Sequence, residues 1–312
     1  MAEGYDYVVI GGGSAGGVAA ARQVSGGERV HVLGAGQSHR HPLLDMPPGI
    51  FKMINGSRYM RYHRTVPQAH LDGRVHDIPQ GHVLGGGSSV NAQVYMRGRP
   101  GDYDAWDRAL RGSNTGAGWG WDDVLPSFTG MEANNRLADA RHGTKGPVAV
   151  SDPGHINEMS RWFVQAMQRL GLPFNADFNG ATQHGVGFYQ FTNSKGRRSS
   201  TAIAFLEPLR NHPGLTIRLG AEVARVAVKK GRAHAVVYRD RTGTHTVAAS
   251  AGIVLAAGAL MTPKLLMVSG IGPAAALRAH GIDILADSPG VGQNLIDHPE
   301  VPSTAFAAGR HG

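Results

Sequence analysis

The chain contains no cysteine, and this absence removes several kinds of chemistry at once. Without thiols there can be no disulfide bridge, no cysteine nucleophile and no cysteine-ligated metal. Long apolar runs are also missing, so the sequence predicts no transmembrane segment. The first residues do not combine a positive charge with an apolar stretch, and a strand pattern begins almost at once, so no export signal is visible. We therefore expect a cytoplasmic protein.

Clustered positive charge is lacking as well, although the chain is basic. The 312 residues carry a formal net charge of +8, with 31 Lys and Arg against 23 Asp and Glu. The basic residues are scattered, without long runs and without interleaved aromatic residues, so we expect no nucleic-acid partner. Hydrophobic residues make up 41% of the chain and charged residues 17%, which is typical of a globular protein, and the length allows two domains.

A glycine motif stands near the start of the chain, between an apolar run rich in β-branched residues and an alanine-rich helical pattern. Residues 7–16 have the sequence YVVIGGGSAG, in which Gly11, Gly13 and Gly16 follow the spacing G-x-G-x-x-G. A second apolar run at 29–33 completes the order strand, turn, helix, strand, which indicates a dinucleotide-binding fold. We expect Gly11 to allow the tight turn, Gly13 to admit a pyrophosphate and Gly16 to let helix and strand pack closely.

An acidic residue is absent where such folds bind the ribose. The expected position lies about 20 residues after the glycines, at the end of the second strand. Gly34 and Ala35 stand there, and no Asp or Glu occurs between Glu28 and Asp45. Arg40 lies nearby, so these residues alone leave NADP, bound through its 2′-phosphate, as an alternative ligand.

A second glycine-rich stretch leads to a family resemblance. Residues 81–92 have the sequence GHVLGGGSSVNA, and VYMRG at 94–98 and DYDAW at 102–106 follow. This order resembles the first signature of the glucose–methanol–choline (GMC) oxidoreductases, except that His82 stands where arginine is usual.

Two later segments resemble the same family in the same order. Residues 258–272, GALMTPKLLMVSGIG, fit the second GMC signature, and residues 290–298, GVGQNLIDH, are also typical. The resemblance covers nearly the whole chain, and NADP binding does not explain it.

The resemblance implies FAD as a non-covalent cofactor. Some family members tether FAD through a histidine just before the signature asparagine, and this chain has Val90 there. The residues that match family contacts to FAD, or that the glycine motif supplies, are Gly11, Gly13, Ser14, Ala15, Gly16, Gly34, Ala35, Val83, Gly86, Ser88, Asn91, Ala92, Gln93, Val94, Val223, Ala257 and Gly258.

The expected fold class is α/β: a Rossmann-like FAD-binding domain with a small antiparallel β insertion, and part of an α+β substrate-binding domain. Strands expected at 215–219, 223–228 and 233–239 would form the insertion, and a helix is expected from Thr262. Apolar residues at helical spacing between 159 and 170 are interpreted as core. The expected domains are 1–150 (FAD-binding, first part), 151–212 (substrate-binding, first part), 213–300 (FAD-binding, second part) and 301–312 (start of the remaining substrate-binding part).

The resemblance also implies the reaction. The family oxidises alcohols: a histidine base takes the hydroxyl proton, and the carbon-bound hydrogen leaves as a hydride to flavin N5. We therefore expect an FAD-dependent oxidase or dehydrogenase that acts on a small alcohol.

The resemblance does not assign a catalytic residue within this sequence. The family's base lies in a C-terminal segment, and this chain stops at Gly312, so we expect poor turnover by residues 1–312 alone. His298, next to Asp297, is the remaining acid/base candidate, although a structural role is favoured for it. A non-catalytic nucleotide-binding remnant or an interaction module, prone to self-association through uncovered apolar surface, stays open as the alternative.

Overall fold

The computed structural model describes residues 4–111 and 118–298, which form two compact units. The first unit consists of residues 4–91 and 200–298, and the second of the described residues between 92 and 199. The sequence places the domain boundaries elsewhere, at 150 and 212, and its last expected segment, 301–312, lies outside the described residues. Which unit holds the cofactor and which the substrate stays a prediction.

The first unit is built on a six-stranded sheet with the strand order β10-β11-β12-β1-β2-β9. Its strands are β1 (Tyr5–Ile10), β2 (Val30–Gly34), β9 (Leu215–Leu219), β10 (Glu222–Lys229), β11 (Arg232–Asp240) and β12 (Gly243–Leu255). The helices of this unit are α1 (Ser14–Ser25), α2 (Pro42–Asp45), α3 (Gly49–Met53), α7 (Gly258–Val268) and α8 (Ala274–Ala279). Short 3₁₀ or π segments are η1 (Ala69–Leu71), η2 (Gly86–Ser89), η3 (Ala202–Leu206) and η4 (Glu207–Leu209).

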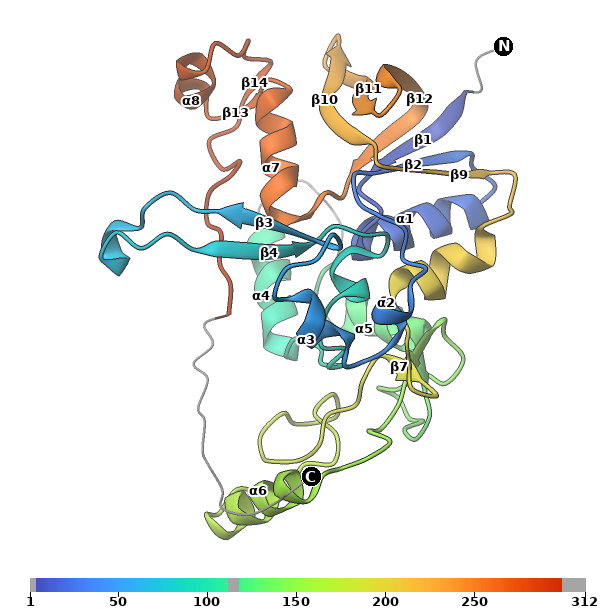
Figure 1. Cartoon of the computed structure of the whole chain (residues 1–312), viewed down its shortest axis with the longest axis vertical. Helices are drawn as coiled ribbons and strands as arrows, with labels where there is room; N and C mark the ends of the chain where they lie inside the picture. Colours follow the sequence, from blue (N-terminus) through green and yellow to red (C-terminus); the bar gives the residue numbers. More distant parts are fainter. Residues whose placement is uncertain (1–3, 112–117, 299–312) are drawn as a thin grey trace. The chain divides into compact units, whose positions relative to one another are not determined.

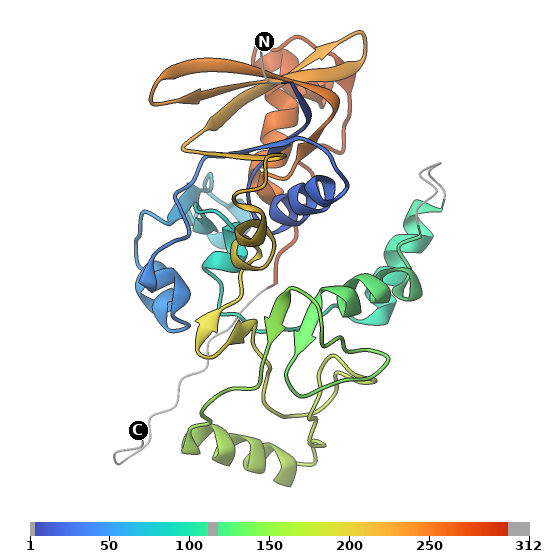
Figure 2. The same cartoon turned by 90° about the vertical axis from the view of Figure 1, so that its right-hand side faces the viewer.

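The sheet combines a parallel part with an antiparallel part, joined by the long strand β12. The second half of β12 pairs with β1 in parallel, and β1 and β2, then β2 and β9, continue the parallel part. The first half of β12 pairs with β11 in antiparallel fashion, and β11 pairs with β10. The α/β fold class with an antiparallel insertion is therefore confirmed, and Figure 2 shows the insertion as the orange strands.

One expected strand belongs to a different part of the sheet. Residues 215–219 do not join the insertion but form β9, the parallel edge strand beside β2. The reason is its apolar face: Leu215, Ile217 and Leu219 alternate toward the hydrophobic cluster that α1 also covers.

Alternating side chains of the central strands fill two hydrophobic clusters. Val9 of β1 lies in a cluster with Ala20 and Val24 of α1, whereas its neighbours Val8 and Ile10 lie in the other cluster. The second cluster includes β10, β11 and α7. A strand covered in this way is apolar on both sides, which explains the uninterrupted apolar run that the sequence shows there.

Two details of the first unit bear on the site. The helix α7 begins at Gly258 rather than near Thr262, so Pro263 lies inside it. A hairpin of β3 (Met60–Arg64) and β4 (Asp77–Gly81) extends from the unit, and β13 (Ile271–Gly272) pairs with β14 (Ala286–Asp287) beside α7 and α8 (Figure 1).

The second unit consists of helices and short strand pairs. Its elements are α4 (Pro100–Leu110), α5 (Trp121–Met131), β5 (Glu132–Asn134), β6 (Val148–Val150), α6 (Glu158–Arg169), β7 (Asn193–Ser194) and β8 (Arg197–Arg198). Tyr103 of α4 packs against Trp121 and Phe128 of α5, with ring centroids 5.7 Å apart in both pairs, and these contacts join the two helices.

The apolar stripe of α6 is not core, contrary to the expectation from its spacing. Phe163 is 61% exposed and Leu170 79% exposed, and Val164 is the buried residue of the helix. Figure 2 shows α6 lying apart from the short strands of its unit. Helical periodicity indicates that a helix has an apolar face, but it does not predict which part of the protein, if any, covers that face.

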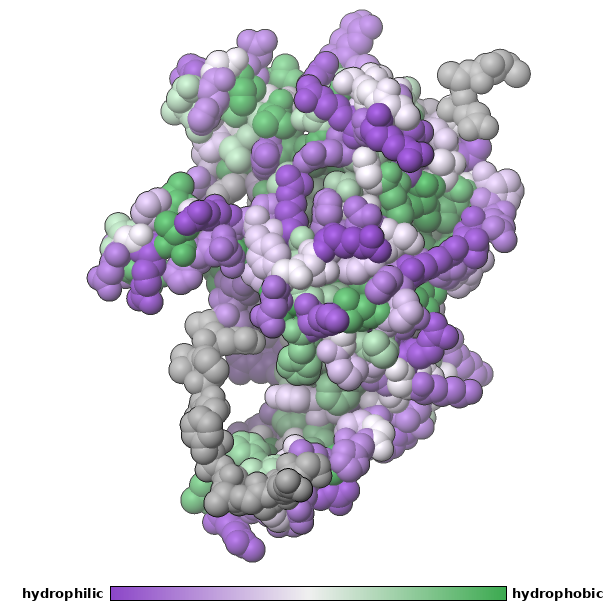
Figure 3. All heavy atoms as spheres, in the orientation of Figure 1, coloured by the Kyte–Doolittle hydropathy of each residue, from purple (hydrophilic) through white to green (hydrophobic). Residues whose placement is uncertain are grey.

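Polar residues dominate much of the surface. Figure 3 shows hydrophilic side chains over much of one face, with smaller hydrophobic areas between them. No helix in the described part of the chain combines the length and the apolarity that crossing a membrane would require.

Candidate functional site

The first glycine motif forms the turn between β1 and α1, and each of its glycines is constrained differently. Gly11 has a φ of +100°, and a Cβ added there would lie 2.3 Å from the carbonyl oxygen of Ala256. A Cβ added at Gly16 would lie 1.8 Å from the carbonyl oxygen of Gly11. At Gly13, by contrast, the nearest atom to an added Cβ is 3.8 Å away. Only Gly13 thus faces free space, as expected for the glycine that would admit a ligand.

The N-terminus of α1 is exposed toward that space without a capping side chain. Gly13 is the N-cap residue, no side chain of the described residues caps the helix, and the first turn contains no acidic residue. The first N–H groups of a helix have no partner within the helix and lie at the positive end of its dipole. This end of α1 can therefore bind an anion such as a pyrophosphate.

The second glycine-rich stretch packs directly against the first. The backbone N–H of Gly85 donates to the carbonyl oxygen of Gly12 over 2.7 Å. Gly86 has a φ of +54°, and a Cβ added there would lie 2.8 Å from the Cα of Gly13. A side chain at Gly86 would therefore collide with the first turn, which explains why a glycine stands in this distant part of the sequence.

The turns, the ends of β2 and β12 and the start of β10 enclose a cavity of about 680 Å³ within the first unit. A volume of this size is in the range of small-molecule and cofactor sites, about 300–1,000 Å³. The predicted residues that line it are Gly11, Gly13, Ser14, Ala15, Gly34, Ala35, Val83, Gly86, Val223, Ala257 and Gly258.

The other predicted residues lie elsewhere. Gly16 packs inside the β1–α1 contact, and Ser88 donates from Oγ to the carbonyl oxygen of Gly85 over 2.7 Å, so neither lines the cavity. Asn91 ends the first part of the same unit and is also outside the cavity lining. His298 is exposed, and its backbone N–H donates to Oδ1 of Asp297 over 2.8 Å. A catalytic role for His298 stays a prediction.

Three predicted residues belong to the second unit. They are Ala92, Gln93 and Val94. Gln93 is 1% exposed, and its carbonyl oxygen accepts the backbone N–H of Thr192 over 2.8 Å. The side chain of Val94 is exposed. A role for these residues toward a cofactor stays a prediction.

The cavity also has polar residues that the sequence did not single out. Arg61 of β3 and Glu222 of β10 line it, and Arg61 Nη1 lies 3.1 Å from Glu222 Oε1. Burial, reinforced by the charge of Arg61, lowers the pKa of His82, which favours a neutral imidazole at the cavity wall. No sequence signal marked Arg61, because it belongs to no motif and its strand β3 was not expected from the sequence.

A smaller hollow of about 440 Å³ adjoins the same wall. The residues that line it are Ala35, Arg61, His82, Gly220, Glu222, Arg239 and Asp240. Asp240 is held by Thr242, His245 and Arg218, whose Nε lies 2.7 Å from Oδ2. The hydrogen bonds from Thr242, above all, lower the pKa of Asp240, so this carboxyl is charged and already bonded.

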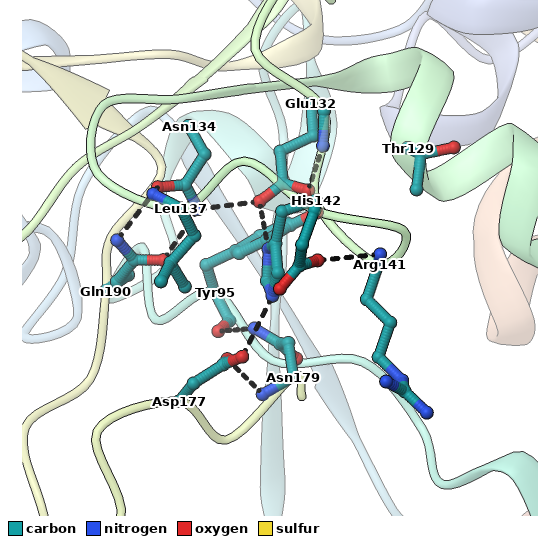
Figure 4. A network of polar contacts seen from close by, with 12 residues as sticks. Tyr95, Thr129, Glu132, Asn134, Leu137, Arg141, His142, Asp177, Asn179 and Gln190 are labelled. Atoms are coloured by element: carbon teal, nitrogen blue, oxygen red, sulfur yellow. Dashed lines mark hydrogen bonds and ion pairs between the residues drawn. The ribbon is translucent and has the colours of Figure 1, made fainter. Parts of the chain in front are cut away.

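The second unit has a buried polar network around Glu132, drawn in Figure 4. Glu132 accepts hydrogen bonds from Arg97 Nη2 at 2.6 Å and Asn134 Nδ2 at 2.7 Å, and its Oε1 lies 3.0 Å from His142 Nδ1. On its other side, His142 Nε2 lies 3.0 Å from Asp177 Oδ2.

The protonation states of the network follow from its partners. Burial alone would raise the pKa of Glu132, but hydrogen bonds from His142 and Asn134 and the charge of Arg97 hold it below its usual value. Burial alone would lower the pKa of His142, but Glu132 and Asp177 raise it above its usual value. The groups bond to one another, so we interpret the network as a structural centre that links residues 92–150 to residues 151–199.

Comparison with known proteins places the chain in a family. The family model described as GMC oxidoreductase matches residues 5–300. The alcohol dehydrogenase [acceptor] of Pseudomonas putida is 41% identical over 310 residues, which are 98% of this chain and 55% of that protein. The oxygen-dependent choline dehydrogenase of Brucella anthropi is 40% identical over 299 residues, covering 95% of this chain and 53% of that protein.

Solved structures give the same result. Pyridoxine 4-oxidase from Mesorbium loti superposes with a TM-score of 0.84 at 36% identity, over 91% of this chain and 55% of that one. A variant of Aspergillus oryzae RIB40 formate oxidase, studied for modification of its FAD, superposes with a TM-score of 0.85 at 27% identity, over 96% and 53%. The chain spans about half the length of the curated relatives it matches. Because the family model matches nearly all of it, the chain belongs to the GMC oxidoreductase family.

Proposed function

We propose that this chain provides the FAD site of an oxidoreductase that acts on the CH–OH group of a small alcohol. The observation that carries the proposal is the cavity in the first unit, where two glycine turns and the uncapped N-terminus of α1 meet. Family membership supports FAD as the ligand. When bound, FAD supplies the redox chemistry by accepting hydrogen from the alcohol carbon.

The residues of the cavity fit the parts of FAD in a definite order. Gly13, Ser14 and Ala15 offer backbone N–H groups to the pyrophosphate, since a helix N-terminus favours negative charge. Gly34 and Val223 line the wall at the end of β2, where a dinucleotide fold binds the adenosine. Val83, Gly86, Ala257 and Gly258 line other parts of the same cavity.

Binding without a covalent bond is supported by the surroundings of Val90. Its side chain is 6% exposed and lies in a hydrophobic cluster with Leu44, Met53 and Tyr59. A valine packed in a core has no group with which to tether a flavin. We therefore expect FAD to be released when the protein is denatured.

The substrate class rests on the relatives. Three of the four relatives are named as an alcohol dehydrogenase, a choline dehydrogenase and a pyridoxine 4-oxidase, and choline and pyridoxine both carry an alcohol group; the fourth is a formate oxidase. We propose an alcohol of similar size for this protein. We also propose a cytoplasmic location, and self-association through exposed apolar residues such as Phe163 and Leu170.

The proposal is tested by reconstitution with FAD. The purified chain is incubated with excess FAD and separated from free ligand by gel filtration, and its visible absorption is recorded. We expect flavin bands to travel with the protein and all flavin to be released by heat or acid. Retention of NADP instead of FAD, or of neither, would contradict the proposal.

A further inference from the structure

The end of β2 lacks the carboxylate that this type of fold uses for the ribose. Gly34 occupies the position, and a Cβ added there would lie 3.2 Å from Cδ2 of Leu219. The carbonyl oxygen of Gly34 accepts the backbone N–H of Ala221 over 3.0 Å. An acid at the end of the second strand binds the ribose hydroxyls in dinucleotide folds. In this chain another group must bind them, or they stay without a charged acceptor.

Another carboxylate lies at the same corner of the cavity. Glu222 is the first residue of β10 and directly follows Ala221, which is bonded to Gly34. Its side chain is 60% exposed, and Glu222 lines the cavity together with Gly34 and Val223. The cavity therefore lacks a carboxylate at the end of β2 but has one at the start of β10, from Glu222.

A cation at the cavity wall holds this carboxylate in place. Arg61 Nη1 lies 3.1 Å from Glu222 Oε1, and Arg61 lines the same cavity. Exposed ion pairs add little stability in general. Here the pair has a different consequence, because it limits where the flexible Glu222 side chain can lie and keeps its carboxylate at the wall of the cavity that Gly34 also lines.

We infer that Glu222 is the residue that recognises the adenosine ribose of the cofactor, in place of an acid at position 34. Its carboxylate accepts hydrogen bonds from the two ribose hydroxyls, and Arg61 acts as its positioning residue. The inference rests on the proposed FAD function. It also gives the cavity a basis for selection, because a negative charge at this corner repels a ligand with a 2′-phosphate, such as NADP.

The test compares ligands that differ only in the ribose hydroxyls. ADP and 2′,3′-dideoxy-ADP compete with FAD for the 312-residue chain and its Glu222→Gln variant, with flavin fluorescence as the readout. Loss of a hydrogen bond to a charged acceptor weakens binding by about 10- to 100-fold. We expect Glu222→Gln to weaken FAD and ADP by about this factor and to leave dideoxy-ADP unchanged. Glu158→Gln, which removes an exposed carboxylate in the second unit, is the matched control and should change none of the three.

A second variant tests the replacement directly. Gly34→Glu should restore FAD binding in the Glu222→Gln background, because it returns a carboxylate to the end of β2. In the parent the same change should give little gain, since two carboxylates would then share one corner.

The possible outcomes separate the inference from the proposed function. If the parent binds no FAD, both fail. If the parent binds FAD but Glu222→Gln has no effect, or weakens ADP and dideoxy-ADP equally, the role of Glu222 is wrong and the FAD site stands. Retained dideoxy-ADP binding also shows that the variant is folded.

Discussion

Replacing Gly13 with aspartate should weaken FAD binding by about 100-fold while leaving the fold intact or slightly more stable. Gly13 is the N-cap residue of α1, with an extended backbone at φ −81° and ψ −162° that any residue can adopt. A Cβ at this position would have its nearest neighbour 3.8 Å away, so the protein itself accommodates a side chain. The added atoms enter the cavity instead, because Gly13 lines it.

The two effects of Gly13→Asp have opposite signs and can be estimated. Aspartate is better than glycine at the N-cap by a few tenths of a kcal/mol, and its charge at the positive end of the helix adds about 0.3–1 kcal/mol. Toward a pyrophosphate the same charge is repulsive. At about 5 Å and an effective dielectric constant of about 20, one pair of like charges contributes about 3 kcal/mol of repulsion. This corresponds to a loss of affinity on the order of 100-fold.

The assay pairs an FAD titration with urea unfolding of the same preparations. Gly13→Asn is the matched control, because it adds a side chain of nearly the same size without charge and is also a good N-cap. Asparagine should weaken FAD less than aspartate does. Gly17→Ala is a second control. Gly17 does not line the cavity, and an added Cβ there would lie 3.6 Å from its nearest neighbours, an ordinary van der Waals distance, so FAD binding should stay unchanged. If Gly13→Asp bound FAD as tightly as the parent, the pyrophosphate would not lie at the N-terminus of α1.

Three further changes have expected effects on stability, each measured by urea unfolding. Gly16→Ala should destabilise by about 1–3 kcal/mol or more, because its Cβ would lie 1.8 Å from the Gly11 carbonyl oxygen; an unchanged midpoint would refute the packing. His31 is 5% exposed, and its ring nitrogens have no hydrogen-bond partner among the described residues. Burial lowers the pKa of His31 to about 4. The free energy of unfolding should therefore fall as the pH drops from 6.5 toward 4, by up to about 1.4 kcal/mol per pH unit. His31→Phe should remove that slope, and a slope that persists would place its origin elsewhere. His142→Gln should cost about 1–3 kcal/mol, because the buried Glu132 loses one charged hydrogen-bond partner but keeps Arg97 and Asn134. Because the folded pKa of His142 is raised, its contribution is complete below pH 6.5 and is lost as pH rises through the folded value, so the deficit should be larger at pH 6 than at pH 9.

Local signals in the sequence were sufficient for the β1–α1–β2 unit and the glycine side of the cavity. The β-branched run, the glycines and the alanine-rich stretch each favour the element that forms, and Gly11 and Gly16 make the close contacts that their spacing predicts. Such agreement is expected where propensity, turn chemistry and packing all favour the same structure.

Contacts between distant segments could not be predicted in the same way. The strand at 215–219 has an apolar alternation that suits either an insertion or a parallel edge, and only its pairing with β2 decides between them. The start of α7 at Gly258 depends on a φ of +86° that follows from the end of β12.

The polar part of the site was missed for a related reason. Glu222 and Arg61 lie 161 positions apart in the chain, and neither belongs to a motif. The buried network around Glu132 likewise joins residues from separate segments. A charged residue in a sequence without a motif resembles a solvated one, and only the fold shows that it faces a cavity or a partner.

The most direct test of the account is a calorimetric titration of the parent chain and its Gly13→Asp variant with FAD. We propose that one FAD lies in the cavity of the first unit, with its pyrophosphate at the N-terminus of α1. This placement predicts saturable binding of one FAD per parent chain, and binding weaker by about 100-fold in the variant. Absence of saturable binding by the parent, or equal affinities of the two proteins, would contradict it.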